Sequence, residues 1–347
     1  MKVLIIGGTR FIGPYVVRRL VELGHKVMIF SRNRSCQSLP QGIWHLWEKR
    51  EALGSFKQEF IHWAPDVVLD MCADSQAQAR TAMAALKGIC RRIVVISSMD
   101  VYRGWDRFFL KTGSSALEKT PFTEDSPLRE NFYPLRDQTK NPEDPEYDYE
   151  KILVEETISS DPGLPYTVLR LPAVYGPGDY RRRLLGIVKR MNDGRPFILM
   201  DAARAKWMRT WGYVENVACA IALAAVDERS KNQVYNVGES TALTQEEWVQ
   251  RVGRAMGWPG RIIFLDAERM PAHLQENQPM DYRQHLSVDT TKIRARLGFT
   301  EQVGFEQGLV KTLEWLRRLS PGPEELKEFD YAAEDACLRR VSGVDPG

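Results

Sequence analysis

KVLIIGGTRFIG, residues 2–13, is the stretch that decides the fold of this chain. Its apolar run, Val3 to Ile6, is short and rich in branched residues, which is typical of a strand buried on both faces of a sheet. The glycine turn Gly7 to Gly13 follows, and after it apolar residues recur at helical spacing from Pro14 to Leu23. A strand, a glycine turn and a helix in immediate succession predict the first unit of a parallel α/β sheet.

The same alternation of strand and helix signals continues through the first half of the chain. Further strands are expected at residues 26–30, 66–70, 93–97 and 166–170. This order predicts an α/β fold with a doubly wound parallel Rossmann sheet and right-handed crossovers. After residue 176 the pattern is mostly helical with short strands. We therefore expect a Rossmann domain at 1–175, to which 209–238 returns, and a smaller mixed α/β C-terminal substrate lobe and tail at 176–208 and 239–347.

Length and composition narrow the class of protein. A chain of 347 residues is long enough for about two domains. Its 48 basic and 46 acidic residues give a net charge of +2, so we do not expect nucleic acid as a partner. Five cysteines, an odd number, are widely spaced, which favours reduced thiols in the cytoplasm. Neither a signal peptide, a membrane span nor a metal site is expected, because no long apolar run and no metal-ligand spacing occurs.

The glycine turn is the first candidate binding site. Such a turn lets the backbone approach a phosphate and aims helix N–H groups at the anion. The usual pattern is GxxGxxG; Gly7 and Gly13 match it, whereas Arg10 replaces the middle glycine. The alternative is a tight turn that binds nothing. Its position after the first strand favours a dinucleotide pyrophosphate held by the whole turn: Gly7, Thr9, Arg10, Phe11, Ile12 and Gly13.

The end of the second predicted strand bears on cofactor choice. NAD-preferring folds usually place an acid there to hold the ribose 2′-hydroxyl. Residues 29–34, IFSRNR, contain none. Ser31 and Arg32, with Arg34 and Arg10, could instead hold a 2′-phosphate, so we expect NADP, with NAD as the alternative. The alternative is that these arginines form a solvated surface.

Two later stretches carry candidate catalytic groups. Ser98 follows the strand at 93–97, at the sheet edge where ligands bind in open α/β folds. Tyr147 and Lys151 are four residues apart, so on a helix they would share a face. A nearby ammonium lowers the pKa of a phenol and makes it usable as a general acid or base. Tyr149 is a rival, but it has no lysine four residues on.

Taken together and in order, these motifs resemble the extended short-chain dehydrogenase/reductase superfamily, in particular its NAD-dependent epimerase/dehydratase group. The resemblance covers about residues 1–318 and rests on Gly7 to Gly13, Ser98 with Tyr102, Tyr147 with Lys151, Leu169-Arg170, Val174 to Gly178, Arg209 with Tyr213-Val214, and Tyr235 to Gly238. It implies that Tyr147 is the acid/base, that Lys151 holds the nicotinamide ribose and tunes Tyr147, and that Ser98 orients the substrate oxygen. It also implies a homodimer.

The departures from the family pattern leave the reaction open. Ala173 stands where sugar-nucleotide enzymes usually have asparagine, and the stretch 209–216, RTWGYVEN, lacks both usual acids. Arg209 remains and could bind a substrate pyrophosphate, or form a structural ion pair. We expect an NAD(P)-dependent epimerase or dehydratase acting on a sugar nucleotide or related small molecule. An NADPH-dependent carbonyl reductase and a non-catalytic, RNA-binding relative are the alternatives.

Two segments have no assigned role at this stage. The insertion at 103–147 could form a lid over the substrate or a subunit contact, and the tail from residue 320 could be a docked helix or a frayed end.

Overall fold

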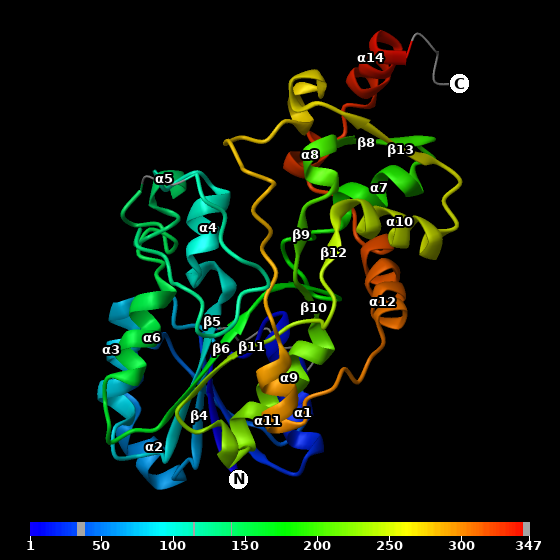
Figure 1. Cartoon of the computed structure of the whole chain (residues 1–347). Helices are drawn as coiled ribbons and strands as arrows, with labels where there is room; N and C mark the ends of the chain where they lie inside the picture. The colour runs from blue at the N-terminus through cyan, green and yellow to red at the C-terminus, as the bar shows by residue number, and fades with distance from the viewer. Residues whose placement is uncertain (33–38, 114, 140, 343–347) are drawn as a thin grey trace.

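Seven parallel strands form the central sheet in a computed structural model that describes residues 1–32, 39–113, 115–139 and 141–342 (Figure 1). Their order across the sheet is β11-β6-β5-β4-β1-β2-β3. This arrangement confirms the predicted doubly wound Rossmann fold. The strands are β1 (Lys2–Ile6), β2 (Lys26–Ser31), β3 (Trp44–Trp47), β4 (Val67–Asp70), β5 (Arg92–Ser98), β6 (Tyr166–Leu171) and β11 (Gln233–Asn236).

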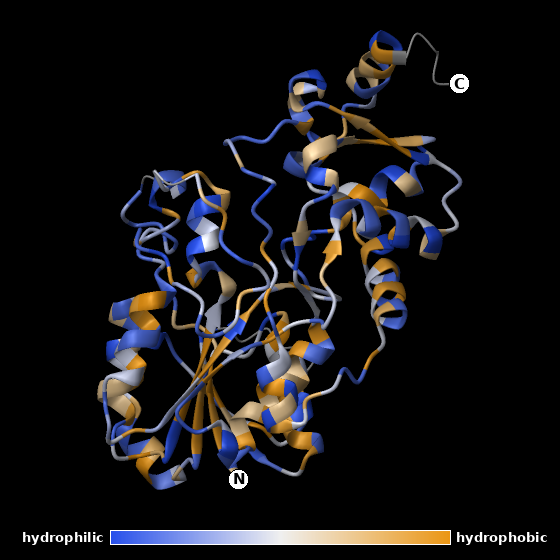
Figure 2. Cartoon of the chain, viewed as in Figure 1, coloured by the Kyte–Doolittle hydropathy of each residue, from blue (hydrophilic) through white to orange (hydrophobic). Residues whose placement is uncertain are grey.

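Helices cover both faces of the sheet, which explains the continuous apolar run of β1. Val3 and Ile5 pack with residues of α1 and α9, whereas Leu4 and Ile6 pack with residues of α3 and α6. All four side chains are buried, and Figure 2 shows the strongly hydrophobic strands enclosed between helices with polar outer faces. The helices of this part are α1 (Ile12–Glu22), α2 (Lys57–Trp63), α3 (Gln76–Leu86), α6 (Lys151–Ser159), α9 (Val214–Val226) and α11 (Thr291–Leu297), with a 3-10 segment η1 (Arg50–Phe56).

The second half of the chain builds a smaller group of helices and short strands beyond the carboxyl edge of the sheet (Figure 1). Strand β8 (Phe197–Asp201) pairs in parallel with β13 (Arg261–Leu265). Its helices are α7 (Leu185–Asn192), α8 (Ala202–Ala205), α10 (Gln245–Met256), α12 (Phe305–Arg317), α13 (Pro323–Leu326) and α14 (Tyr331–Ser342). Short pairs, β7 (Ala173–Tyr175) with β10 (Trp211–Tyr213) and β9 (Met208–Arg209) with β12 (Leu243–Thr244), run between the two parts. Our division into a Rossmann domain and a substrate lobe is an interpretation of this arrangement.

The tail docks on the second lobe through α14. The buried carboxylate of Glu334 accepts hydrogen bonds from Arg190 of α7, at 2.7 and 3.0 Å. Cys337 and Leu338 join a buried apolar cluster with Phe197 and Leu199 of β8. Of the two possibilities left open for the tail, its described part up to residue 342 is therefore a docked helix.

The insertion carries two short helices, α4 (Arg103–Phe108) and α5 (Arg136–Thr139). Phe108 stacks on Trp207 with ring centroids 4.8 Å apart, and Arg107 forms a buried ion pair with Asp281. The insertion therefore packs on residues of its own chain that follow β8. A lid and a subunit contact both remain compatible with this packing.

Two findings concern what the described residues lack. No described helix is both long enough and apolar enough to cross a membrane. The same residues contain no group of three or more His, Cys, Asp or Glu side chains that could hold a metal ion.

Candidate functional site

The glycine turn joins the carboxyl end of β1 to the start of α1, and it is very tightly packed. Gly7 and Gly8 have φ angles of 88° and 77°, which favour glycine. A Cβ added to Gly13 would lie 2.3 Å from the carbonyl carbon of Gly8. Gly7 and Gly13 thus lie in one tight turn, with Thr9, Arg10, Phe11 and Ile12 between them. Gly8, which the sequence argument passed over, is equally constrained, and its signal was the adjacent pair of glycines.

A segment following β7 lies beside this turn. The Tyr15 hydroxyl donates to the carbonyl of Pro177 at 3.2 Å, and the rings of Phe11 and Tyr180 meet edge to face at 6.4 Å. Tyr180 is 71% exposed, so its ring is free to contact a bound molecule at the turn.

The end of β2 presents a hydroxyl and an imidazole. The Ser31 hydroxyl lies 2.8 Å from Nε2 of His45 on the neighbouring strand β3, and His45 stacks on Trp47. Burial lowers the pKa of His45 to about 4, so its ring is neutral at neutral pH. Arg32 is exposed, and Arg34 lies outside the described residues. Sequence reasoning missed His45, because β3 is an exposed edge strand without a clear period.

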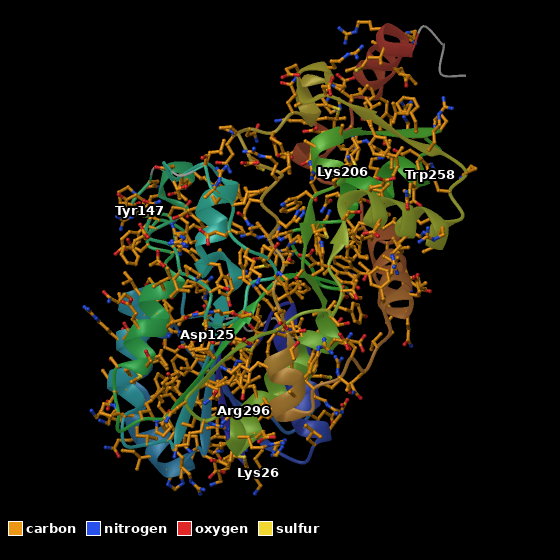
Figure 3. All side chains as sticks on the ribbon, in the orientation of Figure 1. Lys26, Asp125, Tyr147, Lys206, Trp258 and Arg296 are labelled. Carbon is orange, nitrogen blue, oxygen red and sulfur yellow. The ribbon has the colours of Figure 1, made fainter. Side chains whose placement is uncertain are left out.

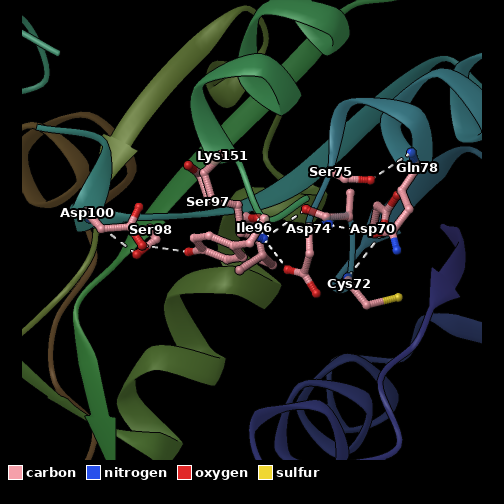
Figure 4. A network of polar contacts seen from close by, with 12 residues as sticks. Asp70, Cys72, Asp74, Ser75, Gln78, Ile96, Ser97, Ser98, Asp100 and Lys151 are labelled. Atoms are coloured by element: carbon pink, nitrogen blue, oxygen red, sulfur yellow. Dashed lines mark hydrogen bonds and ion pairs between the residues drawn. The ribbon is translucent and has the colours of Figure 1, made fainter. Parts of the chain in front are cut away.

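Lys151 is the first residue of α6, and its side chain is buried at the sheet edge (Figure 4). Its ammonium donates to the carbonyls of Ala73 at 2.8 Å and Ile96 at 3.1 Å, and to Oδ1 of Asp74 at 2.7 Å. These three bonds fix the cation at the carboxyl ends of β4 and β5.

Tyr147 does not share a helix with Lys151, so that expectation is wrong. Because α6 begins only at Lys151, Tyr147 lies in a preceding turn. Its ring lies 4.6 Å from the guanidinium of Arg136, and Figure 3 shows it in the insertion near α5. The structure therefore does not bring Tyr147 to Lys151 and Ser98.

Tyr149 takes the place expected of Tyr147. Its hydroxyl donates to Oδ2 of Asp100 at 2.6 Å, and its ring lies 5.6 Å from the Lys151 ammonium. The residue between them, Glu150, has an extended backbone with φ −159° and ψ 96°. Residues two apart on an extended backbone point the same way, so Tyr149 and Lys151 face one site.

The electrostatics of this group favour the protonated phenol. Burial raises the pKa of Tyr149 well above its usual value, and the neighbouring Asp100 carboxylate raises it further. A hydrogen bond with Ser98 acts in the opposite direction. The lowered tyrosine pKa expected beside a lysine is therefore not found at Tyr149.

Asp100 completes the group and was missed by the sequence argument. Its backbone N–H donates to the Ser98 hydroxyl at 3.3 Å, so the two residues share one turn after β5. Burial raises the pKa of Asp100, against the effect of the nearby Arg129. Its Oδ1 is buried and has no hydrogen-bond partner among the residues that the structure describes. The only signal in the sequence was a carboxylate two residues after Ser98.

Arg209 is a half-buried cation. Among the described residues it forms no ion pair, and its Nε is buried without a hydrogen-bond partner. Burial lowers the pKa of Arg209 to about 10, and the neighbouring Arg183 and Arg181 lower it further, while Asp100 opposes them. The guanidinium lies 5.9 Å from the rings of Trp105 and Trp211. The structural ion pair considered for Arg209 is absent from this part of the chain.

The amino-acid sequence is similar to those of several known proteins. The chain is similar to the 2'-dehydrokanamycin reductase of Streptomyces kanamyceticus, with 26% identity over 283 residues that cover 80% of this chain and 72% of the relative. It is also similar to the chloroplast stem-loop binding protein of 41 kDa b of Arabidopsis thaliana, with 23% identity over 355 residues, 98% of this chain and 84% of the relative.

Solved structures share the fold. The dTDP-glucose 4,6-dehydratase of Bacillus anthracis, solved in complex with NAD, matches with a TM-score of 0.67 and 19% identity, over 92% of this chain and 97% of that one. The family model for the NAD dependent epimerase/dehydratase family matches residues 3–238. Since this match spans well over half of the 347 residues, the chain belongs to the NAD-dependent epimerase/dehydratase family.

Proposed function

We propose that this protein moves a hydride between a nicotinamide dinucleotide and a hydroxyl-bearing carbon or carbonyl of a sugar nucleotide or related sugar. The observation that carries the proposal is the Tyr149 phenol, held on Asp100 beside Lys151 and Ser98 at the carboxyl edge of the sheet. Ligands of open α/β folds bind at this edge.

The residues present fit a dinucleotide. The contact between Gly13 and Gly8 leaves no space for a side chain, as a backbone that approaches a phosphate requires. The turn from Gly7 to Gly13 would hold the pyrophosphate, and Lys151 the nicotinamide ribose, as the family resemblance implies. When bound, the nicotinamide supplies or accepts the hydride.

The protonated Tyr149 would act first as a general acid. In the direction of reduction it gives its proton to the carbonyl oxygen of the substrate, while the Ser98 hydroxyl donates a hydrogen bond to the same oxygen. The phenolate that remains lies near the Lys151 ammonium, which stabilises it. In the direction of oxidation the same proton returns to Tyr149.

Arg209 supports an anionic substrate. Its guanidinium is half-buried and its Nε has no hydrogen-bond partner among the described residues, and a phosphate would supply two charge-assisted hydrogen bonds to it. Arg183 and Arg181 lie close enough to lower its pKa, and they are paired with the carboxylates of Asp179 and Glu146 respectively. A nucleoside diphosphate sugar carries the matching charge.

For the cofactor we propose NADP over NAD. Two observations support this choice: the end of β2 carries no acid, and the exposed Arg32 follows it directly, where a 2′-phosphate would need a cation, next to the Ser31 hydroxyl. Calorimetric titration with NADP+ and NAD+ tests this choice. Arg32→Ala should weaken NADP+ binding about 10-fold and leave NAD+ binding unchanged, by the loss of one charge-assisted contact. An unaltered NADP+ affinity would remove the basis for the proposal.

A net reductase is the second candidate, because the reductase of Streptomyces kanamyceticus covers most of this chain. The cofactor that copurifies with the protein separates the two. Tightly held oxidised dinucleotide indicates an epimerase or dehydratase, which regenerates it in each cycle, whereas exchangeable NADPH indicates a reductase. Binding of structured RNA without turnover would instead favour the role that the name of the Arabidopsis relative suggests for that protein.

The catalytic assignment is tested by paired substitutions at two tyrosines. Turnover of dTDP-glucose, UDP-glucose and UDP-glucuronate is followed by product analysis and by nicotinamide absorbance. Tyr149→Phe should lower kcat about 10²- to 10⁴-fold, and Tyr147→Phe should leave it within about threefold. The reverse result would restore Tyr147, our sequence-based choice, as the acid/base.

Two further properties are proposals from resemblance and composition. Family members often dimerise, and we propose a homodimer, to be measured by light scattering after gel filtration. The four described cysteines are free thiols, which supports the cytoplasmic location expected from the sequence.

A further inference from the structure

A fully buried ion pair lies next to the residues of the candidate site, Tyr149, Lys151 and Asp100. The side chains of Arg129 and Glu150 are both 0% exposed and meet through two hydrogen bonds, of 2.9 and 3.2 Å. Arg129 belongs to the insertion, and Glu150 is the residue between Tyr149 and Lys151. Neither side chain faces solvent, and their hydrogen bonds go to each other and to backbone groups, not to the hydroxyls of Tyr149 or Ser98.

Arg129 also holds the segment that carries Asp100. Its Nε donates to the Asp100 carbonyl at 2.6 Å, and its backbone N–H donates to the Val101 carbonyl at 2.8 Å. Its guanidinium therefore fixes the backbone on which the partner of Tyr149 is mounted.

Glu150 holds the segment that carries Tyr149 and Lys151. Its carboxylate accepts from the backbone N–H of Ile152 at 2.8 Å, as the N-cap of α6, and from that of Tyr133 at 2.7 Å. Its own N–H donates to the carbonyl of Asp74, at 2.8 Å. Each carboxylate oxygen therefore bonds both to Arg129 and to a backbone N–H.

We propose that Arg129 and Glu150 are positioning residues, which lock the extended backbone at residue 150 to the turn after β5 and so hold the Tyr149 phenol on Asp100. This inference rests on the role of Tyr149 in the proposed function. It adds two residues that touch neither substrate nor cofactor, and it gives the insertion a part in building the site.

Stability alone does not explain such a pair. Replacing both partners of a buried ion pair by apolar residues of similar volume is often neutral or stabilising. What apolar residues cannot reproduce is the set of directed bonds to Asp100, Ile152 and Tyr133. The pair therefore contributes mainly to the geometry at Tyr149 and not to the stability of the fold.

The test reads the environment of Tyr149 itself. 3-Fluorotyrosine is inserted at position 149, and its fluorine NMR signal is followed as pH rises. Charged and titratable groups around the phenol are Asp100 after β5, Asp74 after β4, Lys151 on α6 and Arg181 after β7. The intact protein should ionise far above free 3-fluorotyrosine, since burial and Asp100 both oppose the phenolate.

The double variant Arg129→Met with Glu150→Leu removes the polar contacts and keeps apolar bulk. Circular dichroism should show that it remains folded. The proton affinity of its phenol should nevertheless move at least tenfold toward that of free 3-fluorotyrosine. The matched control is Arg190→Met with Glu334→Leu, a buried pair in the second lobe with side chains 7% and 0% exposed, which should titrate like the wild type. If the first double variant does not fold, Glu150→Gln breaks the charge pair at constant shape and is titrated instead.

An unchanged titration in the folded double variant or in Glu150→Gln would overturn the inference. Equal shifts in both double variants would also overturn it, because they would show a general loosening. Turnover provides an independent reading where a sugar nucleotide is accepted: a displacement of about 1 Å should lower kcat about 100-fold with little change in KM. Failure of the proposed function would appear as absent turnover in the wild type, which leaves the NMR comparison intact.

Discussion

Gly13→Ala tests how closely the glycine turn is packed. The added Cβ would lie 2.3 Å from the carbonyl carbon of Gly8 and 2.4 Å from its Cα. Because carbon atoms in contact are normally about 3.5–4.0 Å apart, the two segments must separate by about 1 Å or more. Gly13 is also held by its N–H bond to Arg10 at 2.9 Å. Gly8 lies buried over Ile5, so the turn has little room to yield.

This displacement should affect stability and ligand binding to different degrees. Overpacking of a tight contact lowers the free energy of unfolding by about 1–3 kcal/mol. A backbone N–H bonded to a charged oxygen contributes about 1.5–3 kcal/mol. Loss of one such bond to the pyrophosphate weakens dinucleotide binding about 10- to 100-fold.

Calorimetric titration with NADP+ and NAD+, together with thermal unfolding, measures both quantities. The matched control is Gly54→Ala, because nothing lies within 4 Å of a Cβ at that position. It should leave binding unchanged and alter stability by less than about 0.5 kcal/mol. If Gly13→Ala binds both dinucleotides as tightly as the wild type does, the turn is not the pyrophosphate site, whatever happens to stability.

Three further predictions concern stability. Arg92 is buried and donates to the carbonyls of Asp227 and Ala225 at the end of α9, both at 2.7 Å. Arg92→Met should therefore lower the free energy of unfolding, measured in urea, by about 2–4 kcal/mol. The control is Arg91, whose side chain is 82% exposed and paired with Asp66; Arg91→Met should change the free energy of unfolding by less than about 1 kcal/mol. Arg209→Met should raise the thermal midpoint by roughly 1–4 °C, since it removes a half-buried cation that forms no ion pair with the described residues. It should also weaken UDP-glucose binding, and a lower midpoint would contradict our account of Arg209. Burial raises the pKa of Glu239 to about 7, so the folded state binds the proton of this carboxyl more tightly than the unfolded state does. Protonation of Glu239 therefore stabilises the fold fully below about pH 4.5, and this stabilisation is lost as pH rises through 7. Glu239→Gln should therefore gain stability relative to the wild type between pH 5 and 8, while the exposed Glu314→Gln should show no such trend.

The parts of the fold that could be predicted are those decided by burial within one segment. Strands β1, β4 and β5 are apolar on both faces because helices cover both faces of the sheet, and that requirement is visible in a run such as Val3 to Ile6. Strand β3 was missed for the opposite reason. It lies at the sheet edge, Trp44 is 63% exposed, and its pairing with β2 comes from the neighbour and not from its own pattern.

The site was predictable only where one segment supplies the whole geometry. The glycine turn is local, so Gly7 and Gly13 could be placed from spacing alone. The environment of Arg209 is not local, because Arg183 and Arg181 follow β7, Asp100 follows β5, and Trp105 lies in the insertion. A pattern could mark Arg209 as an anion ligand by resemblance, but it could not show that its Nε is buried without a hydrogen-bond partner among the described residues.

The backbone hydrogen bonds explain why Tyr149, and not Tyr147, lies beside Lys151. To bring Tyr147 and Lys151 onto one face, α6 would have to begin a turn earlier, with the N–H of Glu150 bonded to the carbonyl of Glu146 and the Tyr147 carbonyl accepting within the helix. Instead the Glu150 N–H donates to Asp74, and the Tyr147 carbonyl accepts from the Nε of Arg136 at 3.1 Å.

Extending the helix would also break the bonds between Glu150 and Arg129, which fix the residue in its extended form. The spacing YxxxK therefore has its familiar meaning only if the tertiary contacts of the intervening residues permit a helix. In this chain they permit an extended residue, and an extended residue selects the tyrosine two positions before the lysine. A substitution that frees Glu150, such as Arg129→Met, is consequently the change by which Tyr147 would gain access to Lys151. A rise in the effect of Tyr147→Phe on kcat in the Arg129→Met background would reveal that competition, and an effect that stays absent would show that contacts other than Glu150 exclude Tyr147.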